Sequence, residues 1–209
     1  MQSTKGRDMS DHPDNEPILS YAPGSAERIE LQAEMDRQMS HVTEIPCVIN
    51  GEEIFTGNIM TQVIPHKHGH VLANVHLAGP EEMEAACQAA VEAQANWIEM
   101  GLEERCVIFE KAADLLATTW RAKANASTML NQSKTAFQAE IDAVCELVDF
   151  WRFNTYYARN FHDDFQPLIS PDGVQNSTEI RPLEGFVLAI TPFNFTSIAA
   201  NLPSAPAIV

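Results

Sequence analysis

Apolar and polar positions repeat with different periods along the chain, and these periods predict where helices and strands lie. Residues 24–40 carry an apolar stripe at helical spacing, and Ser25 is suited to cap the start of that helix. Asn50 and Gly51 separate two short β-prone runs, which is typical of a hairpin because both turn residues must adopt positive φ. The front of the chain is therefore predicted to hold one helix and then a hairpin.

Two further extended segments are expected at 60–64 and 71–77, joined by a polar turn at 66–70. That turn carries three histidines at alternate positions, namely His66, His68 and His70. Alternate residues of a strand face one side, so the three imidazoles could converge on a metal ion. Lys67 lies among them, however, and no nearby acidic residue or cysteine completes a ligand set. A solvated turn is therefore favoured, and no metal site is predicted.

Three longer stretches carry apolar residues at helical spacing, and each predicts a helix with one buried face. The first begins at Pro80, which suits the first position of a helix, and should bury Met83, Ala86, Cys87, Ala90, Val91 and Trp97. The second begins near Gly101 and should bury Val107, Ile108, Ala112, Leu115, Leu116 and Trp120. The third spans about 135–159 and should bury Ile141, Val144, Cys145, Val148, Trp151 and Phe153.

The pattern changes after residue 160. Turn-forming residues become frequent, and 177–181 alternate like a strand that Pro182 confines to a sheet edge. Residues 186–190 are then continuously apolar and predict a strand, which a polar turn and an apolar helix follow. Such a unit is half of a βαβ crossover and requires a second parallel strand. Because no such strand follows, we expect the chain to be the front portion of a larger α/β enzyme.

Composition narrows the choice of partners. The chain has 209 residues and a formal net charge of -16, from 29 acidic and 13 basic residues. This balance argues against a nucleic-acid or anionic-membrane partner, because both require clustered Lys and Arg. No apolar run approaches the roughly 20 residues that span a bilayer.

The four cysteines are well separated and form neither a CxxC motif nor a zinc knuckle, so a reducing compartment is expected. Cys87, Cys106 and Cys145 lie in helical patterns and are expected to be buried thiols. The first residues lack the apolar stretch of a secretory signal and are too acidic for a mitochondrial transit peptide. Residues 1–16 are therefore expected to form a flexible leader. The expected location is the cytoplasm, or the mitochondrial matrix if the source is eukaryotic.

The turn after Ile190 carries the strongest candidate for chemistry. In open α/β sheets, ligands bind beyond the carboxyl ends of the strands, where this turn would lie. The side-chain amide of Asn194 can donate a hydrogen bond to an oxygen that becomes negative during a reaction. Asn also satisfies backbone groups in tight turns, and on spacing alone that structural role is favoured. No Gly-rich phosphate loop accompanies the turn.

Residues 191–195 read Thr-Pro-Phe-Asn-Phe after the apolar run, and they resemble the Pro-aromatic-Asn-Phe signature of the NAD(P)-dependent aldehyde dehydrogenase superfamily. Further blocks resemble members that act on glutamate γ-semialdehyde, in the same order, at 15–17, 45–48, 68–70, 111–114, 139–143, 146–154, 176–178 and 183–186. The resemblance implies an α/β fold, in which this chain is the N-terminal part of the cofactor-binding domain with a β-hairpin, helices and the first strand of a parallel sheet.

The resemblance also implies an activity, namely NAD-dependent oxidation of L-glutamate γ-semialdehyde to L-glutamate in proline degradation. Asn194 matches the catalytic Asn that stabilises the oxyanion. The stretch that contacts the cofactor NAD is matched by Ile190, Thr191, Pro192 and Phe193. Phe195 matches an aromatic beside the substrate's aliphatic chain, and Glu146 matches a carboxylate near its ammonium group, although a plain helix carboxylate is an equally good account of Glu146. The nucleophilic Cys and the general base Glu are expected beyond Val209.

The domain boundaries follow the resemblance. Residues 17–163 are expected to belong to the cofactor-binding domain, 164–184 to an extended arm of an oligomerisation sheet, and 185–209 to a truncated strand-turn-helix. The expected partners are a small-molecule aldehyde and further copies of the complete subunit. Two alternatives stay open. The chain is a catalytically incomplete fragment that acts at most as an oligomerisation partner, or it belongs to an aldehyde dehydrogenase for another substrate.

Overall fold

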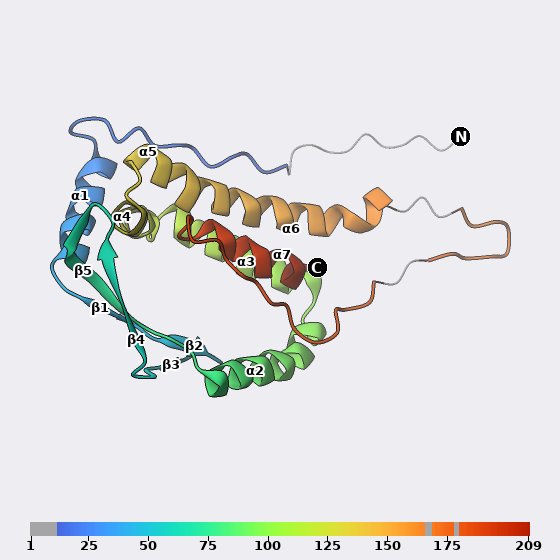
Figure 1. Cartoon of the computed structure of the whole chain (residues 1–209). Helices are drawn as coiled ribbons and strands as arrows, with labels where there is room; N and C mark the ends of the chain where they lie inside the picture. The colour runs from blue at the N-terminus through green and yellow to red at the C-terminus, as the bar shows by residue number, and fades with distance from the viewer. Residues whose placement is uncertain (1–11, 166–168, 178–179) are drawn as a thin grey trace.

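The computed structural model describes residues 12–165, 169–177 and 180–209. The helices in these residues are α1 (Ala26–Met39), α2 (Pro80–Glu99), α3 (Leu102–Ala117), α4 (Arg121–Gln132), α5 (Ala136–Ala139), α6 (Glu146–Phe165) and α7 (Asn201–Ile208). A π-helical turn, η2 (Glu140–Cys145), joins α5 to α6, and a 3₁₀ turn, η3 (Ile198–Ala200), precedes α7. Figure 1 shows α3, α6 and α7 side by side as a helical layer, with α2 set apart from it.

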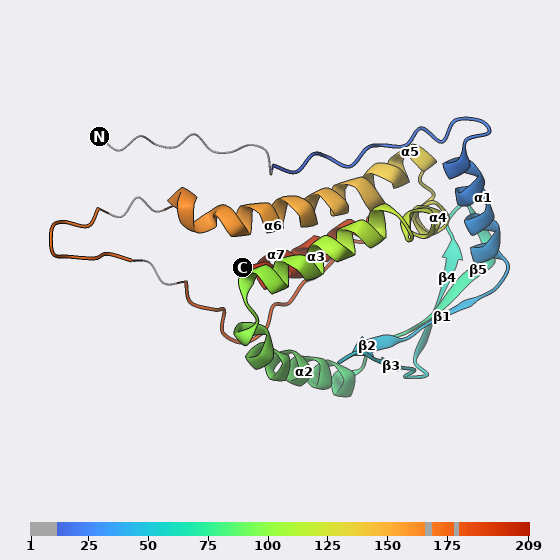
Figure 2. The same cartoon turned by 180° about the vertical axis from the view of Figure 1, so that it is seen from behind.

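The strands of the described residues form two small sheets. They are β1 (Thr43–Ile45), β2 (Cys47–Ile49), β3 (Glu52–Ile54), β4 (Ile59–Ile64) and β5 (Lys67–His76). One sheet has the order β1-β5-β4, in which β1 is parallel and β4 antiparallel to β5. The other is the predicted hairpin β2-β3, whose turn residues Asn50 and Gly51 have φ of 52° and 80°. Figure 2 shows the three-stranded sheet and α1 at one end of the helical layer, and the β2-β3 hairpin beside α2.

The mixed α/β class is confirmed, and so are two predicted helix starts. Helix α1 begins at Ala26, and the Ser25 side chain accepts a hydrogen bond from the backbone N–H of Arg28. Pro80 is the first residue of α2, as predicted. The turn between β4 and β5 is shorter than expected, because β5 already begins at Lys67. These signals depend on neighbours in the chain, so they are read directly from the sequence.

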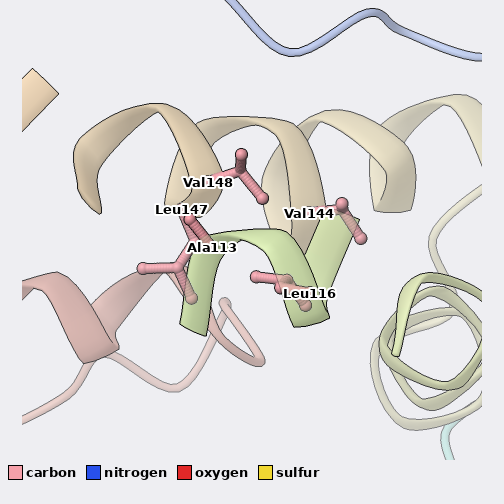
Figure 3. Packing of buried hydrophobic residues seen from close by; sticks show 5 residues of the cluster. All are labelled: Ala113, Leu116, Val144, Leu147 and Val148. Atoms are coloured by element: carbon pink, nitrogen blue, oxygen red, sulfur yellow. The ribbon is translucent and has the colours of Figure 1, made fainter. Parts of the chain in front are cut away.

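The core of the helical layer lies between α3 and α6. Figure 3 shows its five buried apolar side chains, Ala113, Leu116, Val144, Leu147 and Val148. Val144, Cys145 and Val148 are buried as predicted. Leu116 of α3 is also buried as predicted, but Val107, Ile108, Leu115 and Trp120 are exposed, so the rest of the predicted face is wrong. The buried residues of α3 are Cys106, Ala113 and Leu116, since α3 packs on α6 along one narrow stripe.

Helix α2 buries none of its residues, so the packed face predicted for it is also wrong. Residues 90–98 of this helix instead line a cavity of about 870 Å³, whose other walls are Arg105 and Phe109 of α3, the segment 180–187 and the end of the chain. Helix α4 was not predicted, because its buried face is made largely of small and polar residues rather than an apolar stripe. These are Arg121, Asn125, Ala126, Thr128 and Leu130.

The strand predicted at 186–190 is absent from the described residues. The segment is extended but exposed, and the side chains of Leu188 and Ile190 are 68% and 81% accessible to solvent. A strand requires a hydrogen-bonded neighbour, and no described segment pairs with 186–190 in a sheet. Residues 169–177 form an exposed loop that extends away from the helices (Figure 1). Thr178 and Glu179 of the expected edge strand lie outside the described residues.

The leader predicted as flexible up to residue 16 is in fact packed from residue 12 onward. His12 contacts the rings of Phe153 and Tyr156 at centroid distances of 5.3 and 5.1 Å. The Asn15 side chain donates to Asp149 Oδ2 at 2.6 Å. Residues 12–16 therefore lie on α6, where specific side-chain contacts outweigh their polar composition.

A buried polar cluster, which we call the Glu140 network, joins this N-terminal segment to α4 and η2. It consists of Glu16, Tyr21, Arg121, Asn125 and Glu140. The fully buried Glu140 carboxylate accepts hydrogen bonds from Arg121, from the Tyr21 hydroxyl at 2.7 Å and from the Asn125 amide at 2.7 Å. Arg121 also pairs with Glu16 Oε1 at 2.5 Å. The network fixes the start of the long helix that carries Glu146.

Candidate functional site

The turn that carries Asn194 lies between the extended segment 186–190 and η3. Asn194 is exposed, and its side-chain amide makes no hydrogen bond to any described residue. The turn is anchored further along, where the Ser197 hydroxyl donates to the Ala143 carbonyl of η2 at 2.6 Å. The structural role that spacing alone favoured is therefore not the one observed, because the Asn194 side chain satisfies no described backbone group.

The backbone of this turn is held by two side chains from the end of α4 and the loop after it. The Lys134 ammonium donates to the Asn194 carbonyl at 2.8 Å and to Asp142 Oδ2 at 2.5 Å. The Gln132 amide, oriented so that both of its ends are satisfied, donates to the same carbonyl at 3.1 Å. Its oxygen accepts from the backbone N–H groups of Phe195 and Thr196, at 3.2 Å each. The carbonyl is fixed while the amide of the same residue stays free.

Phe195 is half-buried beside the same lysine. The Lys134 ammonium lies 4.5 Å from the centroid of the Phe195 ring, within the range of a cation–π interaction. Phe193, by contrast, is 96% exposed. The two aromatic residues of the motif therefore differ, since one is held against the protein and the other faces solvent.

Glu146 is the first residue of α6 and directly follows the π-helical turn. π-helical turns are rare and frequently occur at functional sites. Ala143, whose carbonyl anchors the Asn194 turn, lies in this π-helical turn three residues before Glu146. Burial raises the pKa of Glu146, Asp142 and Asp149 raise it further, and Lys134 opposes the shift. A half-buried carboxylate among like charges is well suited to bind a cation.

The residues predicted to contact NAD are Ile190, Thr191, Pro192 and Phe193. All four are exposed, and none takes part in a strand in the described residues. An exposed extended backbone with apolar side chains can contact both the hydroxyl groups of a ribose and a flat ring. Residues 190–193 are therefore compatible with binding the nicotinamide-ribose end of NAD.

None of the four cysteine side chains makes a hydrogen bond to the described residues 190–197. Cys106 and Cys145 are buried as expected, whereas Cys87 is only half-buried, which corrects its prediction. Burial raises the pKa of Cys145 to about 12, and the Glu140 charge adds to that shift. A thiol of that kind stays protonated and unreactive at neutral pH.

The histidines of the β4–β5 turn do not form a cluster. The His66 Nδ1 atom instead hydrogen-bonds the Ser133 hydroxyl at 2.7 Å. Within the described part of the chain, no three residues of the types His, Cys, Asp and Glu converge as a metal site. A search of the same residues for a helix long and apolar enough to cross a membrane found none.

Sequence reasoning missed Gln132, Lys134 and Asp142 as parts of this site. Lys134 precedes a helix N-cap, and Asp142 is one of many acidic residues on a helix, so their spacing carried no signal. They become part of the site because the turn, which follows about 60 residues later, folds back onto them.

Comparison with known proteins defines the class. The sequence profile of the aldehyde dehydrogenase family matches residues 56–209, so the chain belongs to this family, as the resemblance predicted. A Δ1-pyrroline-5-carboxylate dehydrogenase of Agaricus bisporus is 49% identical over 196 residues, which are 93% of this chain and 36% of that protein. The human mitochondrial Δ1-pyrroline-5-carboxylate dehydrogenase is 44% identical over 195 residues, which are 93% of this chain and 34% of that protein.

A solved structure shows the same arrangement. The Δ-pyrroline-5-carboxylate dehydrogenase from Mycobacterium tuberculosis bound with NAD matches with a TM-score of 0.89 and 48% identity. The match covers 94% of this chain and 36% of that one. The chain therefore spans about a third of the length of these relatives.

Proposed function

We propose that the complete protein is an NAD-dependent dehydrogenase that oxidises L-glutamate γ-semialdehyde, the open form of Δ1-pyrroline-5-carboxylate, to L-glutamate in proline degradation. The names of the relatives support the substrate and the cofactor. The observation that carries the proposal is the exposed Asn194 amide, which has no described partner and sits on a backbone that Lys134 and Gln132 hold in place.

In this proposal the Asn194 N–H group donates to the aldehyde oxygen as that oxygen becomes negative. A donor that is already oriented stabilises the developing charge without reorganisation. Phe195 packs beside the aliphatic chain of the substrate, and Glu146 accepts its ammonium group. Residues 190–193 hold the nicotinamide-ribose end of NAD, which supplies the hydride acceptor when it is bound. The thiolate nucleophile and the general base come from the part of the relatives' length that these residues do not cover.

The assembly and the location complete the proposal. The subunit forms a homo-oligomer through the segment 164–184, whose described residues 169–177 extend away from the helices (Figure 1). It works in the cytoplasm, or in the mitochondrial matrix of a eukaryotic cell, as the name of the human relative suggests for that protein.

The Asn194→Ala substitution in the complete enzyme tests the role of the amide. The turnover number kcat should fall by roughly 10²-fold or more, which is the cost of losing one oxyanion donor. The KM for NAD should change little. Asn58→Ala is the matched control, because Asn58 is also exposed and its side chain makes no hydrogen bond to a described residue. Equal rates for the two variants would rule out the proposed role of Asn194.

The 209-residue chain by itself should form no NADH from the aldehyde. Cys106 and Cys145 are buried, and none of the four thiols makes a hydrogen bond to the described residues 190–197. The change in absorbance of NADH measures this directly. Measurable turnover by the isolated chain would show that the nucleophile has been assigned to the wrong part of the protein.

A further inference from the structure

Lys134 occupies a loop that is fixed at both ends. Ser133 ends α4 in the left-handed region, with φ of 55°, and the Thr135 side chain caps α5 by accepting from the Gln138 N–H. The Gln138 side chain in turn accepts from the Thr135 N–H at 2.9 Å. This capping box leaves the Lys134 backbone little freedom. Its ammonium therefore extends from a defined base.

The ammonium group makes three contacts, and each joins a different part of the proposed site. It pairs with Asp142 of η2, donates to the Asn194 carbonyl, and lies over the Phe195 ring. Its side chain is 17% exposed, and that of Asp142 is 25% exposed. A partly buried ion pair is screened less by water than a surface pair, so it can hold the loop with a defined geometry.

We infer that Lys134 is a positioning residue, which holds the backbone of the Asn194 turn so that the Asn194 amide faces the aldehyde oxygen. The inference rests on the proposed function. Lys134 fixes the backbone carbonyl of Asn194, and the side-chain amide that donates to the aldehyde oxygen belongs to the same residue. A rotation of this peptide unit would also turn the Cα–Cβ bond of Asn194 and so move the amide. A misplacement of about 1 Å can cost 10²-fold in rate.

Asp142 acts on the Asn194 turn indirectly, through Lys134. It anchors the ammonium to η2, the turn that also anchors Ser197 through the Ala143 carbonyl. Both ends of the segment 194–197 are thus tied to the same π-helical turn. The geometry of the donor is therefore set by η2, with Lys134 as the link.

The experiment is a double-mutant cycle in the complete enzyme, with Δ1-pyrroline-5-carboxylate and NAD as substrates. Lys134→Met should lower kcat by roughly 10-fold to 10²-fold, while the KM for NAD stays unchanged. Lys134→Arg keeps the cation and should restore most of the rate. Adding Lys134→Met to Asn194→Ala should cost nothing further, because the group being positioned is already gone.

Lys123→Met is the matched control. Its ammonium also lies over an aromatic ring, that of Trp120 at 4.1 Å, but the contacts found for it do not reach the Asn194 turn. This variant should keep the wild-type kcat. If Lys134→Met fails to fold, Asp142→Asn gives the same test with a smaller expected loss, because it retains the lysine and the side-chain volume.

The outcomes separate the two proposals. A wild-type kcat for Lys134→Met, or for Asp142→Asn where the former does not fold, overturns the positioning role. The same holds if the losses from Lys134→Met and Asn194→Ala multiply, because Lys134 would then act independently. A wild-type rate for Asn194→Ala defeats the proposed function itself, and the positioning role with it.

Discussion

The Glu140 network and the segment 180–209 meet at η2, but they differ in how far their side chains are covered by the rest of the protein. In the network, both carboxylate oxygens of Glu140 accept hydrogen bonds from side chains up to 119 residues away. In the segment, apolar side chains such as Leu188 and Ile190 face solvent. The first region pairs its buried charges within the described residues, although the Asn125 Oδ1 atom is buried there without a hydrogen bond. The second region displays the apolar character of a strand that a parallel sheet would cover on both faces.

This difference indicates where the energy of folding lies. The N-terminal segment, α4 and η2 are joined by buried hydrogen bonds to Glu140, and the loss of Arg121 would leave that carboxylate buried without its cation. The end of the segment 180–209 is also buried, since Ile208 packs against Cys106 of α3 and Ala158 of α6. Its contacts with α2 lie nearer the surface, such as the Trp97 indole N–H that donates to the Ala207 carbonyl at 2.8 Å. Substitutions in the Glu140 network should therefore lower the free energy of unfolding more than substitutions at these surface contacts.

The largest expected effect comes from Arg121→Met. It leaves the Glu140 carboxylate buried without its cation, which should lower the free energy of unfolding by about 3–5 kcal/mol. Chemical denaturation measures this loss. Arg37→Met is the control, because Arg37 pairs with Glu34 on the exposed side of α1 and its loss should lower the free energy of unfolding far less than that of Arg121. Similar losses for the two variants would show that the network does not stabilise the fold as its burial suggests.

A smaller effect is expected from acid. Burial would raise the pKa of Glu140, but the hydrogen bonds from Arg121, Tyr21, Leu19 and Asn125 outweigh it, so this pKa lies below its ordinary value. A depressed pKa contributes stability that is present above the unfolded-state value of about 4.3, and that is lost as the pH falls through the folded-state value.

Denaturation at a series of pH values between about 5 and 3 should therefore show a loss of stability that Glu140→Gln lacks. The slope of the unfolding free energy against pH should be shallower in that variant than in the wild type. Parallel slopes would mean that other carboxylates account for the acid sensitivity.

The smallest effect is expected from Trp97→Phe in the second region. The substitution removes one hydrogen bond between α2 and α7 in a half-buried position, which should cost about 0.5–1.5 kcal/mol. Trp120→Phe is the control, because the indole N–H of Trp120 has no hydrogen bond to a described residue and its ring is exposed. If Trp97→Phe lowered the free energy of unfolding as much as Arg121→Met, the proposed difference between the two regions would be wrong.

The candidate site combines the exposed Asn194 turn with side chains from α4, the loop after it and η2. Sequence reasoning identified only part of this set. The Asn194 motif and Glu146 were identified through their resemblance to a family, and the family itself is confirmed. Their roles stay predictions. Gln132, Lys134 and Asp142 were missed because a lysine before a helix cap and an acid on a helix carry no distinctive spacing. Their importance depends on a fold that brings residues about 60 positions apart into contact.

The sequence by itself determined what near neighbours in the chain control. The Asn50–Gly51 turn, the Ser25 cap and the start of α2 at Pro80 each depend on backbone preferences within a few residues. The tertiary structure decided which face of α3 is buried, whether 186–190 forms a strand, and that Arg121 meets Glu140 inside the protein. The reason is physical: turns and caps form from local torsions, whereas burial and strand pairing depend on partners that only the packed chain brings into contact.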